Sequence, residues 1–250
     1  MILKICKEVK KILEESNKTN LIKNVTHGKI TSHFSEIKKV PDVCRGQVNI
    51  TNGKASYESM CNNNGEAGFC GNSRFHDKKP ENIKNSIVLL LESPHVDEYD
   101  EDFNPIAPAQ GMTGCAINLK ISECLNDIFN MCPYAKVDDG EYPLIIGNPI
   151  QWQTSLHHIL GLNLWEQTGK SIRNKVWRTI WEQVCVKNDF NDRLKSYGSV
   201  LIINACTSGL KDLVKKYLKE HYLKEHSKKQ VICYHPCIWS SRGYGSKKVD

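Results

Sequence analysis

Four short apolar runs, each followed by polar residues, dominate the chain from residue 87 onward. The runs occupy residues 87–91, 144–146, 200–203 and 231–233. The stretches between them carry apolar residues at helical spacing, which predicts the element order β-α-β-α-β-α-β. This alternation is typical of a parallel sheet covered by helices. We therefore expect an α/β fold, a three-layer α/β/α sandwich with a central, mostly parallel four-stranded sheet.

Apolar stripes predict the helices that accompany these strands. Residues 114–129, 172–194 and 210–222 repeat apolar side chains at the spacing of an amphipathic helix. The same spacing at residues 2–15 predicts a further helix near the N-terminus. In the stretch 210–222 the lysines alternate with the apolar face, so we expect them to point outward.

Residues 41–85 interrupt this regular pattern. They are rich in Gly, Asn, Ser and Cys and show little periodicity, which indicates an irregular insertion or a weakly paired hairpin. We expect a single domain over residues 1–250. It would consist of an N-terminal helical region at 1–40, the insertion at 41–85 and a catalytic core at 86–245.

The composition is that of a water-soluble protein, with 40% hydrophobic and 25% charged residues. The longest apolar run, residues 87–91, is too short to cross a bilayer. Charged residues break the apolar N-terminus, so it does not read as a secretory signal. We expect a cytoplasmic monomer without a membrane partner. The net charge of +6 is compatible with a phosphate-binding surface, although solvated lysine faces would give the same value.

Eleven cysteines in a chain without a secretory signal are expected to be reduced thiols rather than disulfides. Cys44, Cys61, Cys70 and His76 could supply four metal ligands. Their spacing matches no compact zinc motif, which favours free thiols and leaves a metal site as the alternative.

Each predicted strand ends at a residue that can carry chemistry. Glu92 follows the first strand, Asn148 the second, Thr207 and Ser208 the third, and His235 the fourth. In open α/β sheets, ligands bind outside the carboxyl ends of the strands. We therefore expect these side chains, distant in sequence, to meet along one edge of the sheet.

The motifs at these positions resemble those of the uracil-DNA glycosylase superfamily, and of its family 4 in particular. Residues 91–98, Leu-Glu-Ser-Pro-His-Val-Asp-Glu, resemble the first motif of family 4, Gly-Glu-Ala-Pro-Gly followed by an acidic run. Residues 109–114, Ala-Gln-Gly-Met-Thr-Gly, are similar to the loop that opens the next helix. Residues 147–150 resemble the strand-end Thr-Asn-Val-Val of the family, and residues 205–210 resemble its third strand-to-helix turn. Residues 235–242 resemble its His-Pro-Ser loop with the distal arginine.

The resemblance implies a DNA glycosylase, which flips a base out of the duplex and hydrolyses its N-glycosidic bond to leave an abasic site. The residue types fit that chemistry. An oxocarbenium-like sugar needs a nearby carboxylate, and the departing base needs a donor. Glu92 and His235 are the predicted catalytic residues, with Asp97 and Glu98 as secondary acidic candidates.

A base-binding site is predicted around Asn148, whose amide can both donate and accept at the edge of a pyrimidine. The resemblance adds Ser93 and His95 from the first motif. Phe103 and Ile106 lie near the position of the aromatic residue that stacks on uracil in the family.

DNA contacts are predicted for Thr207, Ser208, Ile238, Trp239 and Arg242. Ile238 and Trp239 occupy the place of an apolar wedge that enters the duplex, and Arg242 is expected to clamp a phosphate.

The chain departs from the family 4 pattern at three places. The cysteines that hold an iron-sulfur cluster have no counterparts, so we expect no cluster and no other cofactor. The stacking aromatic is replaced near Ile106 by Asn-Pro-Ile-Ala-Pro, and His95 replaces a glycine. These departures favour a modified base over plain uracil, in particular a bulky modified cytosine in viral DNA. Such an enzyme would act in antiviral defence.

The sequence alone leaves two alternative functions open. The first is a repair glycosylase for uracil or deaminated bases. The second is a non-catalytic nucleic-acid-binding module on the same fold. Taken singly, Glu92 could cap the next segment, Asn148 could belong to a turn, and His235 could mark an ordinary strand exit.

Overall fold

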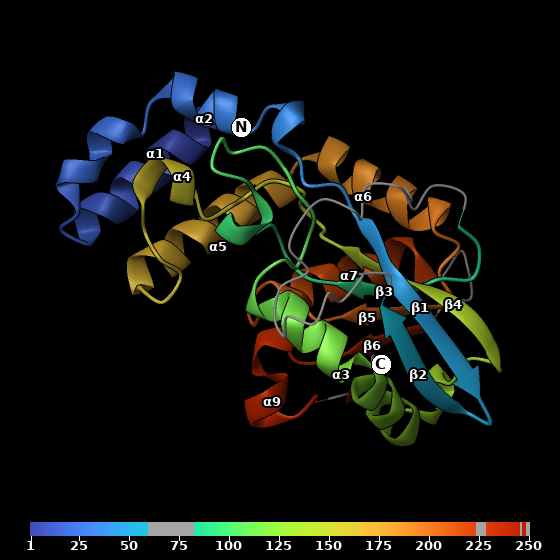
Figure 1. Ribbon diagram of the computed structural model, residues 1–250. Coiled ribbons are helices and arrows are strands. Elements are labelled where there is room, and N and C mark those ends of the chain that lie inside the picture. Colours follow the sequence, from blue (N-terminus) through green and yellow to red (C-terminus); the bar gives the residue numbers. More distant parts are fainter. Residues whose placement is uncertain (60–82, 224–228, 246, 249–250) are drawn as a thin grey trace.

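Seven strands form one sheet in the part of the chain that the computed structural model describes, which comprises residues 1–59, 83–223, 229–245 and 247–248 (Figure 1). Their order is β2-β1-β4-β3-β5-β6-β7. The bounds are β1 Val43–Thr51, β2 Lys54–Ser59, β3 Ile87–Leu90, β4 Gly140–Gly147, β5 Leu201–Asn204, β6 Lys229–Ile232 and β7 Lys247–Lys248. Strands β4, β3, β5 and β6 are parallel to one another. Strands β1, β2 and β7 pair with their neighbours in the antiparallel direction.

Helices cover both faces of the sheet and confirm the predicted α/β/α sandwich. Val88 and Leu90 of β3 pack in a core with α1, α2, α5, α6 and α7, whereas Ile87 and Leu89 pack in a second core with α3. The α-helices are α1 Ile2–Glu15, α2 His27–His33, α3 Met112–Met131, α4 His157–Leu160, α5 Gln167–Trp181, α6 Val184–Ser196, α7 Lys211–His221 and α9 Trp239–Arg242. The 3-10 helices are η1 Thr19–Asn24, η2 Glu36–Lys38, η4 Val96–Glu98, η5 Pro133–Ala135 and η6 Pro236–Ile238. None of the helices in the described residues is long and apolar enough to cross a membrane.

The sheet is wider than the predicted four strands. The four apolar runs form its parallel centre, β3 to β6, but β1 and β2 extend it beyond β4. These two strands come from the segment predicted to be an irregular insertion or a weakly paired hairpin, and they confirm the hairpin. They meet at a two-residue turn, Asn52-Gly53, in which both residues have positive φ, as tight hairpins require. Residues 60–82, with Cys61, Cys70 and His76, lie outside the described residues, so the predicted metal alternative stays untested.

Two helical details differ from the sequence predictions. The predicted helix over residues 172–194 is two helices, because the backbone turns to an extended conformation at Gln183 between α5 and α6. Both halves continue the apolar spacing, so the pattern carries no sign of the break. In α3, Leu119 belongs to the stretch predicted to carry an apolar stripe but is 76% exposed, whereas Ile117 and Ile121 are buried.

The strand order creates a natural place for a ligand. From β3, at the centre of the parallel strands, the chain passes to β4 on one side and then crosses to β5 on the other. The carboxyl ends of β3 and β5 therefore lie where the strand order reverses. Ligands bind at such switch points in open α/β sheets.

Candidate functional site

The carboxylate of Glu92 lies at this switch point and is held from two other elements. Arg173 of α5 forms an ion pair with Oε1. Thr207, which follows β5, donates to Oε2 from its hydroxyl and from its backbone N–H, the latter at 3.0 Å. Glu92 and Arg173 are 7% and 5% exposed, and buried charges are stable only when paired in this way. Thr207 contacts this carboxylate, and its predicted contact with DNA stays a prediction.

The main chain around Glu92 is held as firmly as its side chain. Trp177 donates from Nε1 to the Glu92 carbonyl oxygen at 2.9 Å, and Cys206 donates to the Leu91 carbonyl. Arg173 and Trp177 are one turn apart on α5, so one helix face fixes both the carboxylate and the backbone that carries it.

Arg173 is a site residue that sequence reasoning missed. Burial lowers the pKa of its guanidinium to about 10, so it remains a cation at neutral pH. The sequence does contain a sign of this role. Arg173 lies at helical spacing from the apolar residues Val176 and Trp177, which places it on the buried face of α5. A cation on that face needs a buried partner, and the partner is Glu92.

His235 follows β6, at the start of η6. Its Nδ1 accepts a hydrogen bond from the backbone N–H of Cys237 at 3.4 Å and lies 3.1 Å from the Cys237 thiol. Since a backbone N–H can only donate, the proton of the neutral ring is on Nε2. Burial, together with the cations Lys211 and Arg173 and the neighbouring His95, lowers the pKa of His235 to about 4. His235 is therefore neutral at pH 7.

Arg173 is linked electrostatically to both predicted catalytic residues. It is paired with Glu92, and its charge is among the causes that lower the pKa of His235. Lys211, the first residue of α7, completes the positive surroundings by donating from Nζ to the Cys233 carbonyl at the end of β6. Lysines of this helix were expected to face outward, but Lys211 is half-buried and burial lowers its pKa.

Asn148 is fixed through its backbone and leaves its side chain unused. The Asn148 N–H donates to Asp42 at 3.2 Å, and Arg193 donates to the Asn148 carbonyl at 3.2 Å. Arg193 also pairs with Asp42, which accepts a further bond from the Tyr197 hydroxyl at 2.7 Å. Within the described residues, neither Oδ1 nor Nδ2 of this fully buried amide has a hydrogen-bond partner. Both its donor and its acceptor capacity are therefore left unused by the described residues.

The other predicted base-binding residues lie in different surroundings. Ser93 shares a hydrogen bond of 2.7 Å with the Thr154 hydroxyl. His95 is exposed and pairs with Asp97 through a contact of 3.1 Å. Ile106 is half-buried and packs against the core on the α3 side of the sheet. These positions leave Asn148 as the best-defined candidate for reading a base.

Phe103 does not present a free face for stacking on a base. Its ring lies between His158, with centroids 3.8 Å apart, and His33, with centroids 5.2 Å apart. The backbone of Phe103 has positive φ, in a tight turn closed by its N–H to the Asp100 carbonyl. That turn directs the ring toward α2 and α4, so the predicted role in base binding is corrected here.

Glu98 supports a loop instead of supplying a second charged carboxylate. It is 5% exposed, and its Oε1 accepts from the Ala109 N–H at 2.8 Å. Burial raises the pKa of Glu98 to about 8, so its neutral form dominates at pH 7. Arg45, fully buried in β1, donates to the Pro108 and Ala109 carbonyls of the same loop. A side chain at Gly114 would clash with the Ala109 carbonyl, which explains the glycine at this point of the motif.

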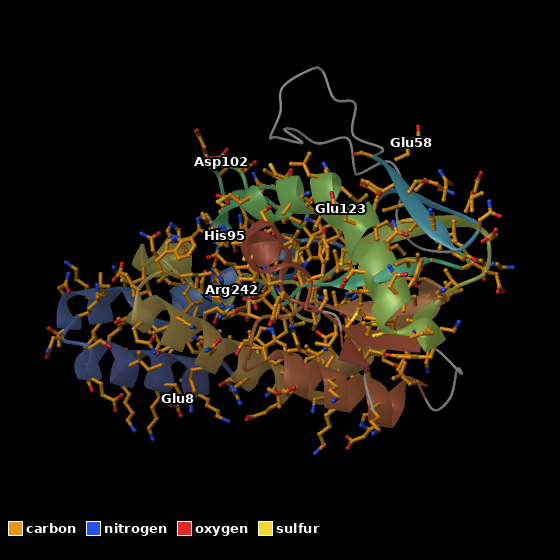
Figure 2. All side chains as sticks on the ribbon, turned by 90° about the horizontal axis from the view of Figure 1, so that it is seen from below. Glu8, Glu58, His95, Asp102, Glu123 and Arg242 are labelled. Carbon is orange, nitrogen blue, oxygen red and sulfur yellow. The ribbon has the colours of Figure 1, made fainter. Side chains whose placement is uncertain are left out.

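The predicted DNA-binding residues divide into buried and exposed groups. Trp239 is 3% exposed, and its Nε1 donates to the Tyr234 carbonyl at 2.8 Å, so its predicted role as a wedge is wrong. An apolar wedge must be exposed, and Trp239 belongs to the core. Ile238 is half-buried, and Ser208 and Arg242 are exposed. Figure 2 labels Arg242, which is the last residue of α9.

No family model, curated protein or solved structure matches this chain. The chemical content of the site therefore follows from its residues. It combines a buried carboxylate, a neutral imidazole, two cations and an unpaired amide at the carboxyl edge of a parallel sheet.

Proposed function

We propose that this protein is a DNA glycosylase that flips out a modified base and hydrolyses its N-glycosidic bond, leaving an abasic site. The favoured substrate is a bulky modified cytosine in viral DNA, and the corresponding role is antiviral defence. The observation that carries the proposal is the buried carboxylate of Glu92, held by Arg173 and Thr207 at the switch point of the sheet, with His235 following the parallel strand β6 at the same edge. A carboxylate and a neutral imidazole around one reacting bond suit glycosidic hydrolysis.

Glu92 would act on the sugar and on the attacking water. An ionised carboxylate offers about four acceptor positions, and Arg173 and Thr207 supply three donors. The remaining position can orient a water toward C1′. As the C1′–N bond breaks, its electron pair leaves with the base, the carboxylate stabilises the cationic sugar, and water adds at C1′ with loss of a proton.

His235 would act on the departing base. Its neutral ring carries the proton on Nε2, so it can donate a hydrogen bond to the negative charge that develops on the base. The nearby cations Arg173 and Lys211 favour the same charge. A histidine with its pKa near 4 is a poor proton donor at pH 7, so we expect it to stabilise a base anion rather than protonate the base.

The substrate class follows from what surrounds Asn148. Its unpaired amide suits the edge of a pyrimidine. Neither Phe103 nor the loop at residues 104–108 offers a free aromatic face, so plain uracil would lack stacking worth about 1–3 kcal/mol per base. We therefore favour a pyrimidine that carries a substituent.

The test is a panel of duplexes that differ in one base: cytosine, 5-hydroxymethylcytosine, the same base bearing a hexose, and uracil. After incubation, alkali cleaves at abasic sites and the products are measured on a gel. We expect cleavage at a modified cytosine and little or none at uracil. Efficient excision of uracil alone would support a repair glycosylase, which Asn148 would serve equally well. DNA binding without any cleavage would support a non-catalytic module.

A further inference from the structure

Several buried polar atoms without a hydrogen-bond partner lie in the two segments that follow β3 and β4, next to the candidate site. Such atoms are rare in proteins, because a buried polar group without a partner has lost its hydrogen bonds to water without replacement. Within the described residues, four side chains in the segments that follow β3 and β4 carry them, although each side chain is at most 5% exposed. The atoms are Oε2 of Glu98, Nε2 of Gln110, Oδ1 and Nδ2 of Asn148, and Nε2 of Gln153.

The two segments run side by side, so these residues belong to one region. The first segment, residues 92–111, follows β3, and the second, residues 148–155, follows β4. Three hydrogen bonds join them: Ile150 N–H to the Glu92 carbonyl at 3.5 Å, the Ser93 and Thr154 hydroxyls at 2.7 Å, and Gln153 N–H to the Tyr99 hydroxyl at 3.2 Å.

The backbone around these side chains is held in place by other groups. The Gln153 carbonyl contacts Nε2 of His33 at 2.6 Å, and the Gln153 Oε1 accepts from the His158 N–H at 3.4 Å. Gln110 directly follows Ala109, which is anchored by Glu98 and Arg45. The unsatisfied groups are therefore carried on a fixed framework, as a preorganised binding surface requires.

The chemistry of these groups indicates a neutral, hydroxyl-rich ligand. The two glutamines offer amide donors, and Asn148 offers a donor and an acceptor. A phosphate or carboxylate would call for exposed cations, whereas the unpaired atoms of these two segments belong to amides and one carboxyl group. Asn148 by itself can satisfy part of a pyrimidine edge, so the remaining atoms call for further polar groups on the ligand.

We infer that Glu98, Gln110 and Gln153 read a polyhydroxylated substituent, such as a hexose, on the pyrimidine that Asn148 holds. This inference rests on the proposed function and names the part of the substrate that determines specificity. A hexose hydroxyl both donates and accepts, so it can pair with an amide NH₂ and with a carboxyl oxygen. Sites built to hydrogen-bond a substrate group discriminate strongly against substrates that lack it.

The test compares two duplexes that differ only in the hexose on a 5-hydroxymethylcytosine. The variants are Gln110→Leu and Gln153→Leu, with Gln167→Leu on the exposed start of α5 as the matched control. We expect each site variant to lower the ratio of kcat/KM for the hexose-bearing base over the unglycosylated base by about tenfold or more, as loss of one buried hydrogen bond predicts. Gln167→Leu should leave the ratio unchanged. Thermal unfolding checks that each variant folds.

Equal losses on both substrates would assign the glutamines a structural role and overturn the inference, while the proposed function would stand. If the wild type excises neither base, the proposed function fails, and binding then tests the inference alone. Fluorescence anisotropy with duplexes carrying a 2′-fluoro sugar, which resists cleavage, should show tighter binding when the hexose is present. Gln110→Leu and Gln153→Leu should abolish that preference. Equal affinity of the wild type for both duplexes would overturn the inference.

Discussion

Arg173 in the middle of α5 and Glu92 after β3 form an ion pair in which both side chains are less than a tenth exposed. Removing one partner of such a pair strands a buried charge. We therefore predict that Arg173→Met lowers the free energy of unfolding by about 3–5 kcal/mol, measured by urea denaturation. Combining it with Glu92→Gln should recover part of this loss, which a double-mutant cycle measures as coupling.

The exposed pair of Lys4 and Glu182, with contact at 2.6 Å, is the control for that cycle. Surface pairs of this kind couple by about 0.2–1 kcal/mol. A coupling between Arg173 and Glu92 no larger than that of Lys4 and Glu182 would contradict the account of a buried pair.

The pH dependence of excision is predicted from His235. Burial and the neighbouring Lys211, Arg173 and His95 lower the pKa of this imidazole to about 4. The neutral ring is the active form and predominates above that pKa, so the single-turnover rate should be flat from pH 6 to 8 with respect to this group. It should fall only as the pH approaches 4. A rate that falls around pH 6.5 in the wild type, but not in His235→Ala, would show an ordinary histidine and contradict the assignment.

Glu98 should make the protein less stable as the pH rises, whereas most carboxylates have the opposite effect. Its pKa is about 8 in the folded protein, well above the ordinary value of 4.5, so between these two values the folded state holds a proton that the unfolded state releases. The contribution of this bound proton to the free energy of unfolding is fully present below pH 4.5 and is lost as the pH rises through 8. We expect Glu98→Gln to raise Tm relative to the wild type at pH 8 and much less at pH 5. The opposite order, with a larger gain at pH 5, would show that Glu98 is ionised when folded.

Arg242 and Trp239 both lie in α9, but their variants should affect different properties, DNA binding for Arg242 and stability for Trp239. Arg242 is exposed, so Arg242→Ala should weaken DNA binding and reduce the salt slope of log K by about 1. Trp239 is buried, so Trp239→Ala should cost about 3–5 kcal/mol of stability. Anisotropy titrations at several salt concentrations and urea denaturation measure the two effects. An unchanged salt slope in Arg242→Ala would remove this residue from the DNA-binding surface.

The strands and their polar ends could be predicted because their signals are local. Each apolar run is short and followed by turn residues, so the positions of Glu92, Asn148 and His235 at strand ends follow from the chain order. The contacts that define the site could not be predicted in this way. Arg173 meets Glu92 across 81 positions of sequence (173 − 92), and Asp42 reaches the Asn148 backbone from before β1.

Local patterns also misassigned individual aromatic residues. Trp239 follows a histidine-proline turn as a wedge would, but its neighbours on α3 and β6 bury it. Phe103 lies in a polar, acidic stretch that suggests an exposed loop, yet a positive φ turns its ring between two histidines. Which face of a loop residue is covered depends on tertiary contacts that the sequence pattern does not contain.

The most direct test of the proposed chemistry is the single-turnover rate of base excision in Glu92→Gln, measured on whichever modified duplex the wild type cleaves best. The control is Glu14→Gln, an exposed glutamate of α1. Loss of one positioned electrostatic group predicts a rate about a hundred- to a thousandfold below the wild type, with DNA affinity nearly unchanged and Glu14→Gln fully active. Excision by Glu92→Gln at the wild-type rate would contradict the assignment of Glu92 as the catalytic carboxylate.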